Sequence, residues 1–136
     1  MEQQVSLTAT LKERQLIESC KLSEHALSYD EFLRVDLRVG RIVSVSEFPE
    51  ARKPAYKLRV DFGSEIGTRW TSAQITKRYT KEALKDKKVV AVVNFPPKRI
   101  AGFVSEVLVL GVDDGNGGVI LLEPESDEAP LGARVY

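Results

Sequence analysis

Short apolar runs separated by Pro, Gly and Asp recur along most of the chain, and this pattern predicts strands rather than long helices. In the first run, DLRVGRIVSVSEF, Gly40 interrupts the alternation of apolar and polar residues and predicts a β-bulge. In the second run, YKLRVDF, every second residue is apolar, so Lys57 and Arg59 share the polar face. The predicted strands are residues 36–48, 56–62, 68–73, 89–95, 107–110 and 119–122.

Two stretches carry helix signals. Ser28 and Glu31 form a capping-box pattern, which opens a short helix. Residues 75–84 are the strong helical stretch in the middle of the chain, with Thr80 as a second N-cap.

The order of these elements predicts the fold class. Three strands, a helix and two or three further strands, without internal repeats, are typical of a five-stranded OB-fold barrel with its helix between strands three and four. An SH3-like barrel is the alternative, but it does not need a helix at this point. The sequence therefore predicts an all-β domain with short helices over residues 28–136. Residues 1–27 form an N-terminal extension that is expected to be partly helical or disordered.

Charge is unevenly distributed along the chain, although the 20 basic and 20 acidic residues balance. Residues 34–104 hold 16 Lys and Arg against 7 Asp and Glu, whereas residues 105–136 hold 1 against 7. Such an asymmetry predicts an anion-binding surface in the middle of the chain. An ordinary solvated face is the alternative, because charges that are close in sequence need not be close in space.

Other functional classes find little support in the sequence. No apolar run approaches the roughly 20 residues that span a bilayer, and the N-terminus lacks the apolar core of a secretory signal. The lone cysteine, Cys20, fits a reducing cytoplasm, and with His25 alone it cannot build an ordinary zinc site. The run GNGG leads into a strand, which makes it a hairpin turn rather than a phosphate loop. We therefore expect a cytoplasmic protein with no membrane insertion, no catalytic residues, no metal and no cofactor.

Several segments resemble, in order, the CsaA proteins: DLRVGRI, FPEARKPAYKLRVDFG, SAQIT, VVAVVNFPPKRIAGFVSEVLVLG and GARV. CsaA proteins are small bacterial and archaeal relatives of the C-terminal tRNA-binding domain of some methionyl-tRNA synthetases. The resemblance covers residues 29–135 and implies an OB fold, a homodimer, tRNA binding and an export-related chaperone activity. Synthetase-linked relatives carry a Lys-x-Arg-Gly…Ser-x-Gly-Met pattern. Here Lys98, Arg99 and Ser105 are kept, whereas Glu106 puts an anion where those relatives have none.

The candidate phosphate contacts are Lys98 and Arg99, in a loop stiffened by two consecutive prolines. Arg binds phosphate through two parallel N–H bonds, and Lys acts as a mobile point charge. A solvated turn that merely keeps the protein soluble is the alternative. Asn94 and Ser105 bracket the loop and are predicted to bond a base or a sugar, unless local bonds use them to tie the turn together.

Trp70 has polar neighbours in sequence, which predicts a half-exposed ring that stacks on an unpaired base beside the guanidinium of Arg69. A buried core position is the alternative for this Trp. Arg52 and Lys53, at the tip of the PEARKP loop, are predicted rim contacts, with simple solubility as an equally good explanation.

The predicted function is a homodimeric, non-catalytic tRNA-binding protein that holds backbone phosphates with the basic loop. The alternative is a chaperone that holds unfolded or pre-export polypeptides in apolar grooves at the dimer surface. Exposed Phe95, Ile100 and Phe103 would favour that alternative. Dimerisation is expected because a small barrel has exposed edges that need a partner. The expected interface residues are Phe32, Leu33, Leu131 and Val135.

Overall fold

The computed structural model describes residues 10–22 and 25–136, and the chain divides into two compact units. The first unit is Met1–Val35 with Tyr136, and its helices are α1 (Leu11–Leu22) and α2 (Tyr29–Leu33). The predicted capping box at α2 is confirmed. The Ser28 hydroxyl accepts the N–H of Glu31, and the Glu31 carboxylate accepts the N–H of Ser28. The parts of the predicted extension at residues 1–9 and 23–24 lie outside the described residues.

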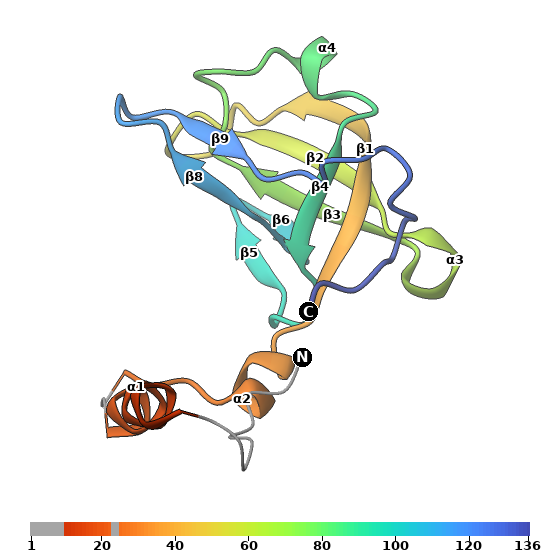
Figure 1. Ribbon diagram of the computed structural model, residues 1–136. Coiled ribbons are helices and arrows are strands. Elements are labelled where there is room, and N and C mark those ends of the chain that lie inside the picture. Colours follow the sequence, from red (N-terminus) through yellow and green to blue (C-terminus); the bar gives the residue numbers. More distant parts are fainter. Residues whose placement is uncertain (1–9, 23–24) are drawn as a thin grey trace. The chain divides into compact units, whose positions relative to one another are not determined.

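The second unit, Asp36–Val135, is an antiparallel, nearly closed barrel of the OB type, as the sequence predicts (Figure 1). Its sheet has the strand order β3-β2-β1-β4-β7, so β1 pairs with β2 on one side and with β4 on the other. A short turn of helix, α3 (Gly63–Ile66), joins β2 to β3. The strands of this sheet are β1 (Leu37–Glu47), β2 (Tyr56–Asp61), β3 (Thr68–Ala73), β4 (Lys88–Val92) and β7 (Leu108–Val109).

A helix lies between the third and fourth strands as predicted, but it is much shorter than the sequence indicates. Only α4 (Lys81–Leu84) is helical, and the Thr80 hydroxyl caps it by accepting the N–H of Ala83 at 3.1 Å. The prediction of helix from residue 75 is wrong because Ile75 is buried in the barrel core. Burial of its side chain outweighs the local helix propensity of this stretch.

Alternation along β2 builds the core. Leu58 and Val60 are fully buried, while Lys57 and Arg59 lie on the outer face, as predicted. Each large apolar side chain that is buried in this way stabilises the fold by about 1.5–3 kcal/mol. The largest fully buried apolar side chains are Phe62, Ile42, Leu58, Leu84, Val60 and Val89.

The bulge predicted at Gly40 occurs further along β1. Gly40 itself pairs regularly with Val89, and the register of β1 against β2 shifts between Ile42 and Ser44. Gly40 is required for another reason. A Cβ there would lie 2.6 Å from Cγ1 of Val60, closer than real carbon contacts allow.

The loop predicted at residues 96–102 is largely a β-hairpin, formed by β5 (Lys98–Ile100) and β6 (Phe103–Ser105). Its turn places Ala101 at φ 48° and Gly102 at φ 82°, the left-handed region that two-residue hairpin turns use. The prediction of a simple loop fails because the two strands are only three residues long and carry a weak sequence signal.

A second hairpin, β8 (Gly111–Asp113) with β9 (Val119–Leu121), follows the sheet. The predicted DDGNGG turn joins its strands. The Asp114 carboxylate accepts the N–H groups of Asn116 and Gly118, and these bonds lower the pKa of Asp114.

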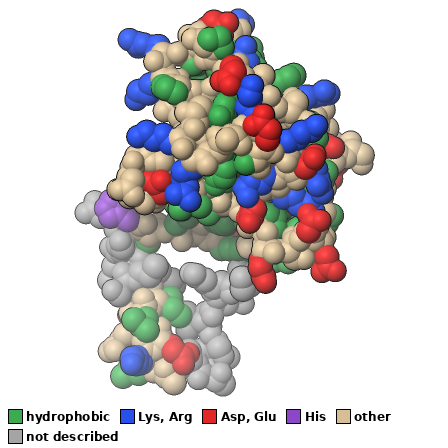
Figure 2. Space-filling model, turned by 90° about the horizontal axis from the view of Figure 1, so that it is seen from above, with side chains coloured by type: hydrophobic (Ala, Val, Ile, Leu, Met, Phe, Trp, Pro, Cys, Tyr) green, Lys and Arg blue, Asp and Glu red, His purple; other side chains and the backbone are tan. Residues whose placement is uncertain are grey.

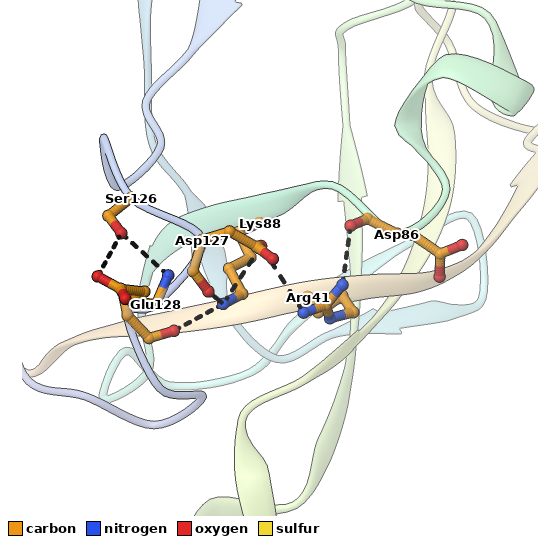
Figure 3. A network of polar contacts seen from close by, with 7 residues as sticks. Arg41, Asp86, Lys88, Ser126, Asp127 and Glu128 are labelled. Carbon is orange, nitrogen blue, oxygen red and sulfur yellow. Dashed lines mark hydrogen bonds and ion pairs between the residues drawn. The ribbon is translucent and has the colours of Figure 1, made fainter.

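The acidic C-terminal segment, residues 123–135, is bound along β1 and β4, and we call it the C-terminal strap. Val39 on β1 donates its N–H to the carbonyl of Ala133 (3.0 Å) and accepts the N–H of Gly132 (2.8 Å). The strap also takes up cations of the barrel (Figure 3). The ion pairs that its acidic residues make with the barrel are Lys88–Asp127 (3.5 Å), Arg41–Asp127 (4.0 Å) and Lys87–Glu123 (2.8 Å).

Replacing Gly40→Ala is expected to destabilise the protein by about 1–3 kcal/mol, because the added methyl group has no space beside the fully buried Val60 and Phe62. Equilibrium unfolding in urea measures the loss. The control is Ser44→Ala, an exposed position on the same strand, which should change stability by less than about 0.5 kcal/mol. Equal stability of the Gly40→Ala variant and the parent would contradict the close packing described here.

Candidate functional site

A groove lies on the barrel between the loop at residues 49–54 and the β5–β6 hairpin, with a volume of about 790 Å³. We call it the basic groove, because four predicted site residues line it. Apolar side chains from β7 and β9 and the buried Ile75 line it as well. The four cations of the groove are Arg52, Lys53, Lys98 and Arg99.

Strand geometry separates the two cations of the hairpin. Lys98 pairs with Ser105, and Arg99 pairs with Val104, so their side chains point to opposite faces of β5. The two side chains are therefore not presented on one side of the hairpin. Both residues still border the groove, and each can reach a different anion.

The cations around the groove have no acidic partners among the described residues, in contrast to those beside the C-terminal strap. The strap neutralises Arg41, Lys87 and Lys88 on the other side of the barrel. Figure 2 shows Lys and Arg side chains in a row along one edge of the barrel. The uneven distribution of charge along the sequence therefore corresponds to an uneven distribution of charge on the surface of the barrel. The cations without an ion pair at or near the groove are Arg52, Lys53, Lys57, Arg59, Lys98 and Arg99.

An aromatic row leads from the groove onto the outer face of β2 and β3. Phe48 lines the groove, and its ring centroid is 5.4 Å from that of Phe103, which in turn lies 6.1 Å from that of Trp70. Both pairs are edge-to-face. Lys57 Nζ lies 4.8 Å from the ring centre of Phe48 and 5.3 Å from that of Phe103, within cation–π range.

Trp70 is 42% exposed, which confirms the predicted half-exposed ring and excludes a core position. The guanidinium beside it belongs to Arg59, whose Cζ is 5.9 Å from the indole centre. Arg69 pairs with Val60 and lies on the opposite face of β3, so it is not the neighbour that the sequence suggests. Only the register of β2 against β3 could have identified Arg59.

The outer edge of β3 is closed by separate side-chain and backbone bonds rather than by a continuous strand ladder. Thr71 is only 1% exposed, and its hydroxyl donates to the carbonyl oxygen of Val107 at 2.6 Å and lies 3.1 Å from the Ser105 hydroxyl. Ser105 also accepts the N–H of Ser72 at 3.3 Å. Ser105 therefore fastens the hairpin to the barrel through bonds to residues 34 and 33 positions away, instead of tying the turn together locally.

Glu106, the anion that departs from the synthetase pattern, completes the same edge. Its N–H donates to the carbonyl of Trp70 at 2.8 Å, and its Oε2 accepts the N–H of Trp70 at 2.8 Å. The carboxylate thus accepts the bond that a carbonyl of a neighbouring strand would otherwise accept. The sequence shows the charge of Glu106 but does not predict this bond, because the bond joins residues 36 positions apart.

The remaining predicted residues lie away from the groove. Asn94 accepts the N–H of Asp36 at 3.0 Å and so joins the end of β4 to the start of β1. Of the expected interface residues, Phe32 and Leu33 are on α2, while Leu131 and Val135 belong to the strap. All four of these are half-buried, and their role in a dimer stays a prediction.

No helix in the described part of the chain is long and apolar enough to cross a membrane. Within the same residues, no group of three or more His, Cys, Asp or Glu side chains is placed to hold a metal ion.

Comparison with known proteins adds to this geometry. The family described as putative tRNA binding domain matches residues 37–134. The CsaA chaperone structures from Bacillus anthracis and Picrophilus torridus are each 52% identical to this chain, with TM-scores of 0.75 and 0.74. Each match covers 81% of this chain, together with 98% and 99% of the respective structures. A methionine–tRNA ligase of Pyrococcus abyssi is 38% identical over 134 residues, which is 98% of this chain but only 18% of the ligase.

Replacing Thr71→Val is expected to cost about 1–3 kcal/mol, because it removes the donor to the Val107 carbonyl in a buried place. Thermal or urea unfolding measures the cost. Thr68→Val, a half-exposed position on the same strand, serves as the control and should stay within about 0.5 kcal/mol of the parent. If both variants lose equally little, the hydroxyl is not what closes this edge.

Proposed function

Because the chain belongs to the putative tRNA-binding domain family, and within it to the CsaA proteins, we propose that it binds tRNA in the basic groove. It acts as a non-catalytic binding protein of the cytoplasm. The observation that carries the proposal is the set of cations around one groove that have no carboxylate partner in the described part of the chain. A polyanion supplies the missing counter-charge.

The physical basis is neutralisation of backbone phosphates. Each phosphate that meets a Lys or Arg releases condensed counterions, which drives binding at low salt. Arg52 and Lys53 line the groove from one side, and Lys98 and Arg99 line it from the other, so a single strand or a loop of RNA can lie between them. The aromatic row at the end of the groove provides stacking surface for bases that are not paired.

A second candidate function is the holding of unfolded polypeptides, supported by an exposed apolar face. On the β8–β9 hairpin, the outward side chains of Val112 and Ile120 face each other across the ladder and are 49% and 37% exposed. Leu122, 41% exposed, extends this face. Contiguous exposed apolar surface is typical of protein-binding sites, and the two solved relatives at 52% identity are described as chaperones.

The variant Lys98→Ala with Arg99→Ala is expected to weaken tRNA binding at low salt and to flatten the salt dependence. Each lost phosphate contact lowers the slope of log affinity against log salt by roughly 0.7–0.9, so the pair should lower it by between one and two. Filter binding of bulk tRNA across a salt series measures both quantities. Suppression of aggregation of an unfolded protein should persist in this variant, because the β8–β9 face is unchanged.

The matched control is Lys77→Ala with Lys85→Ala, which removes two exposed cations that do not line the groove. It should leave the slope nearly unchanged. If the two double variants bind tRNA with the same affinity and slope, the groove is not the RNA site and the proposal fails.

We expect a homodimer that uses α2 and the strap. Light scattering at micromolar concentration should give twice the 15.2 kDa chain mass. Phe32→Ser should shift the mass towards a single chain, because a polar side chain weakens an apolar interface. Phe95→Ser, which changes a 52% exposed ring outside the expected interface, should remain dimeric. A parent protein that stays monomeric would refute the expected assembly.

A further inference from the structure

Glu106, which is bonded to the residue that carries the exposed indole, uses only one of its two carboxylate oxygens as an acceptor in the described part of the chain. Its Oε2 and its N–H are both bonded to the backbone of Trp70, at 2.8 Å each, and these two bonds fix the side chain against β3. Its second oxygen, Oε1, has no hydrogen-bond or ion-pair partner among the described residues. A fixed carboxylate with an unused acceptor therefore sits next to the residue that carries the ring.

The surroundings of this carboxylate determine what it can accept. The groove cations lie at the hairpin and at residues 49–54, whereas Glu106 lies at the Trp70 end of the aromatic row. A carboxylate repels a phosphate, so the position directly beside the Glu106 carboxylate suits the base of a nucleotide, while the guanidinium of Arg59 lies over the indole ring. Trp70 is 42% exposed, and Phe103 and Arg59 contact its ring.

We propose that Trp70 and Glu106 together select the base that binds here. An unpaired base stacks on the indole, and its exocyclic amine donates a hydrogen bond to the Glu106 carboxylate. The inference rests on the proposed RNA binding and adds the class of base that is recognised. An ionised carboxylate only accepts hydrogen bonds. It therefore favours cytosine, which carries an amine at C4, over uracil, which carries a carbonyl oxygen there.

The test compares two fluorescein-labelled oligoribonucleotides, oligo-C and oligo-U of equal length, by anisotropy with the full-length protein. The parent should bind oligo-C about fivefold more tightly than oligo-U, which is the effect of one net hydrogen bond. The intrinsic fluorescence of Trp70, the sole Trp of the chain, should be quenched more strongly by oligo-C at equal concentration.

Glu106→Gln is the decisive variant because it keeps the shape of the side chain. The amide oxygen can still accept the N–H of Trp70, while the amide NH₂ replaces the free carboxylate oxygen and donates. The ratio of oligo-C to oligo-U affinity should fall to about one or invert. Glu125→Gln removes the same charge from an exposed position in the strap and should leave the ratio at its parental value.

A second pair of variants tests the stacking. Trp70→Leu should reduce the affinity for oligo-C about fivefold or more, and Trp70→Phe should restore most of it, because base–aromatic stacking tolerates a smaller ring. Affinity that is equal in both variants would overturn the stacking role.

The outcomes separate this inference from the proposed function. A ratio near one in the parent, or a ratio unchanged by Glu106→Gln, overturns base selection, even if tRNA still binds with a salt slope that depends on Lys98 and Arg99. A parent protein that does not bind tRNA would instead refute the proposed function together with the inference.

Discussion

The closure of the barrel at the outer edge of β3 is the constraint on which the rest of the site depends. β7 is only two residues long and pairs with β4, so no continuous ladder covers β3. Thr71, Ser105 and Glu106 supply the missing bonds from their side chains and backbone. These bonds fasten the β5–β6 hairpin, and the hairpin forms one wall of the basic groove. The polar atoms that satisfy an exposed edge thereby also fix the position of Lys98 and Arg99 relative to the loop at residues 49–54. A hairpin of this length would not hold such a geometry alone, because an isolated two-stranded hairpin is at best marginally stable in water.

The distribution of charge follows from the same architecture. The acidic C-terminal strap runs along β1 and β4, where it pairs with three cations of the barrel. It lines neither the groove nor the aromatic row. A chain with zero net charge can therefore present one face with uncompensated positive charge and another in which charges cancel. Exposed ion pairs of this kind contribute little to stability. Their effect is to confine the uncompensated positive charge to the side of the barrel that carries the basic groove.

Much of the fold could be predicted from local patterns in the sequence. The alternation in β2, the capping box before α2, the N-cap at Thr80 and the order of strands and helix are all properties of short segments, and each is found in the structure. The sequence-based predictions were wrong where tertiary packing, rather than the local sequence, determines the structure. Ile75 is drawn into the core instead of a helix, and Gly40 is selected by the side chains of Val60 and Phe62 rather than by a bulge. The β5–β6 hairpin was missed because three-residue strands leave too few positions for a period to be visible.

The site shows the same division between local and non-local information. The loop cations could be named from sequence, because Pro and Gly around them indicate exposure. The partner of Trp70 could not, since strand alternation turns the adjacent Arg69 to the other face and the register brings Arg59 beside the ring. Glu106 looked like a charge out of place on an RNA-binding surface, yet its bonds to Trp70 give it a structural role that requires an acceptor at that position. Once one oxygen is used in this way, the Glu106 side chain is fixed against the backbone of Trp70, and this is the premise of the proposed base recognition. In the proposed function, phosphates meet the cations of the groove, and an unpaired base meets the indole and the Glu106 carboxylate at the other end of the aromatic row.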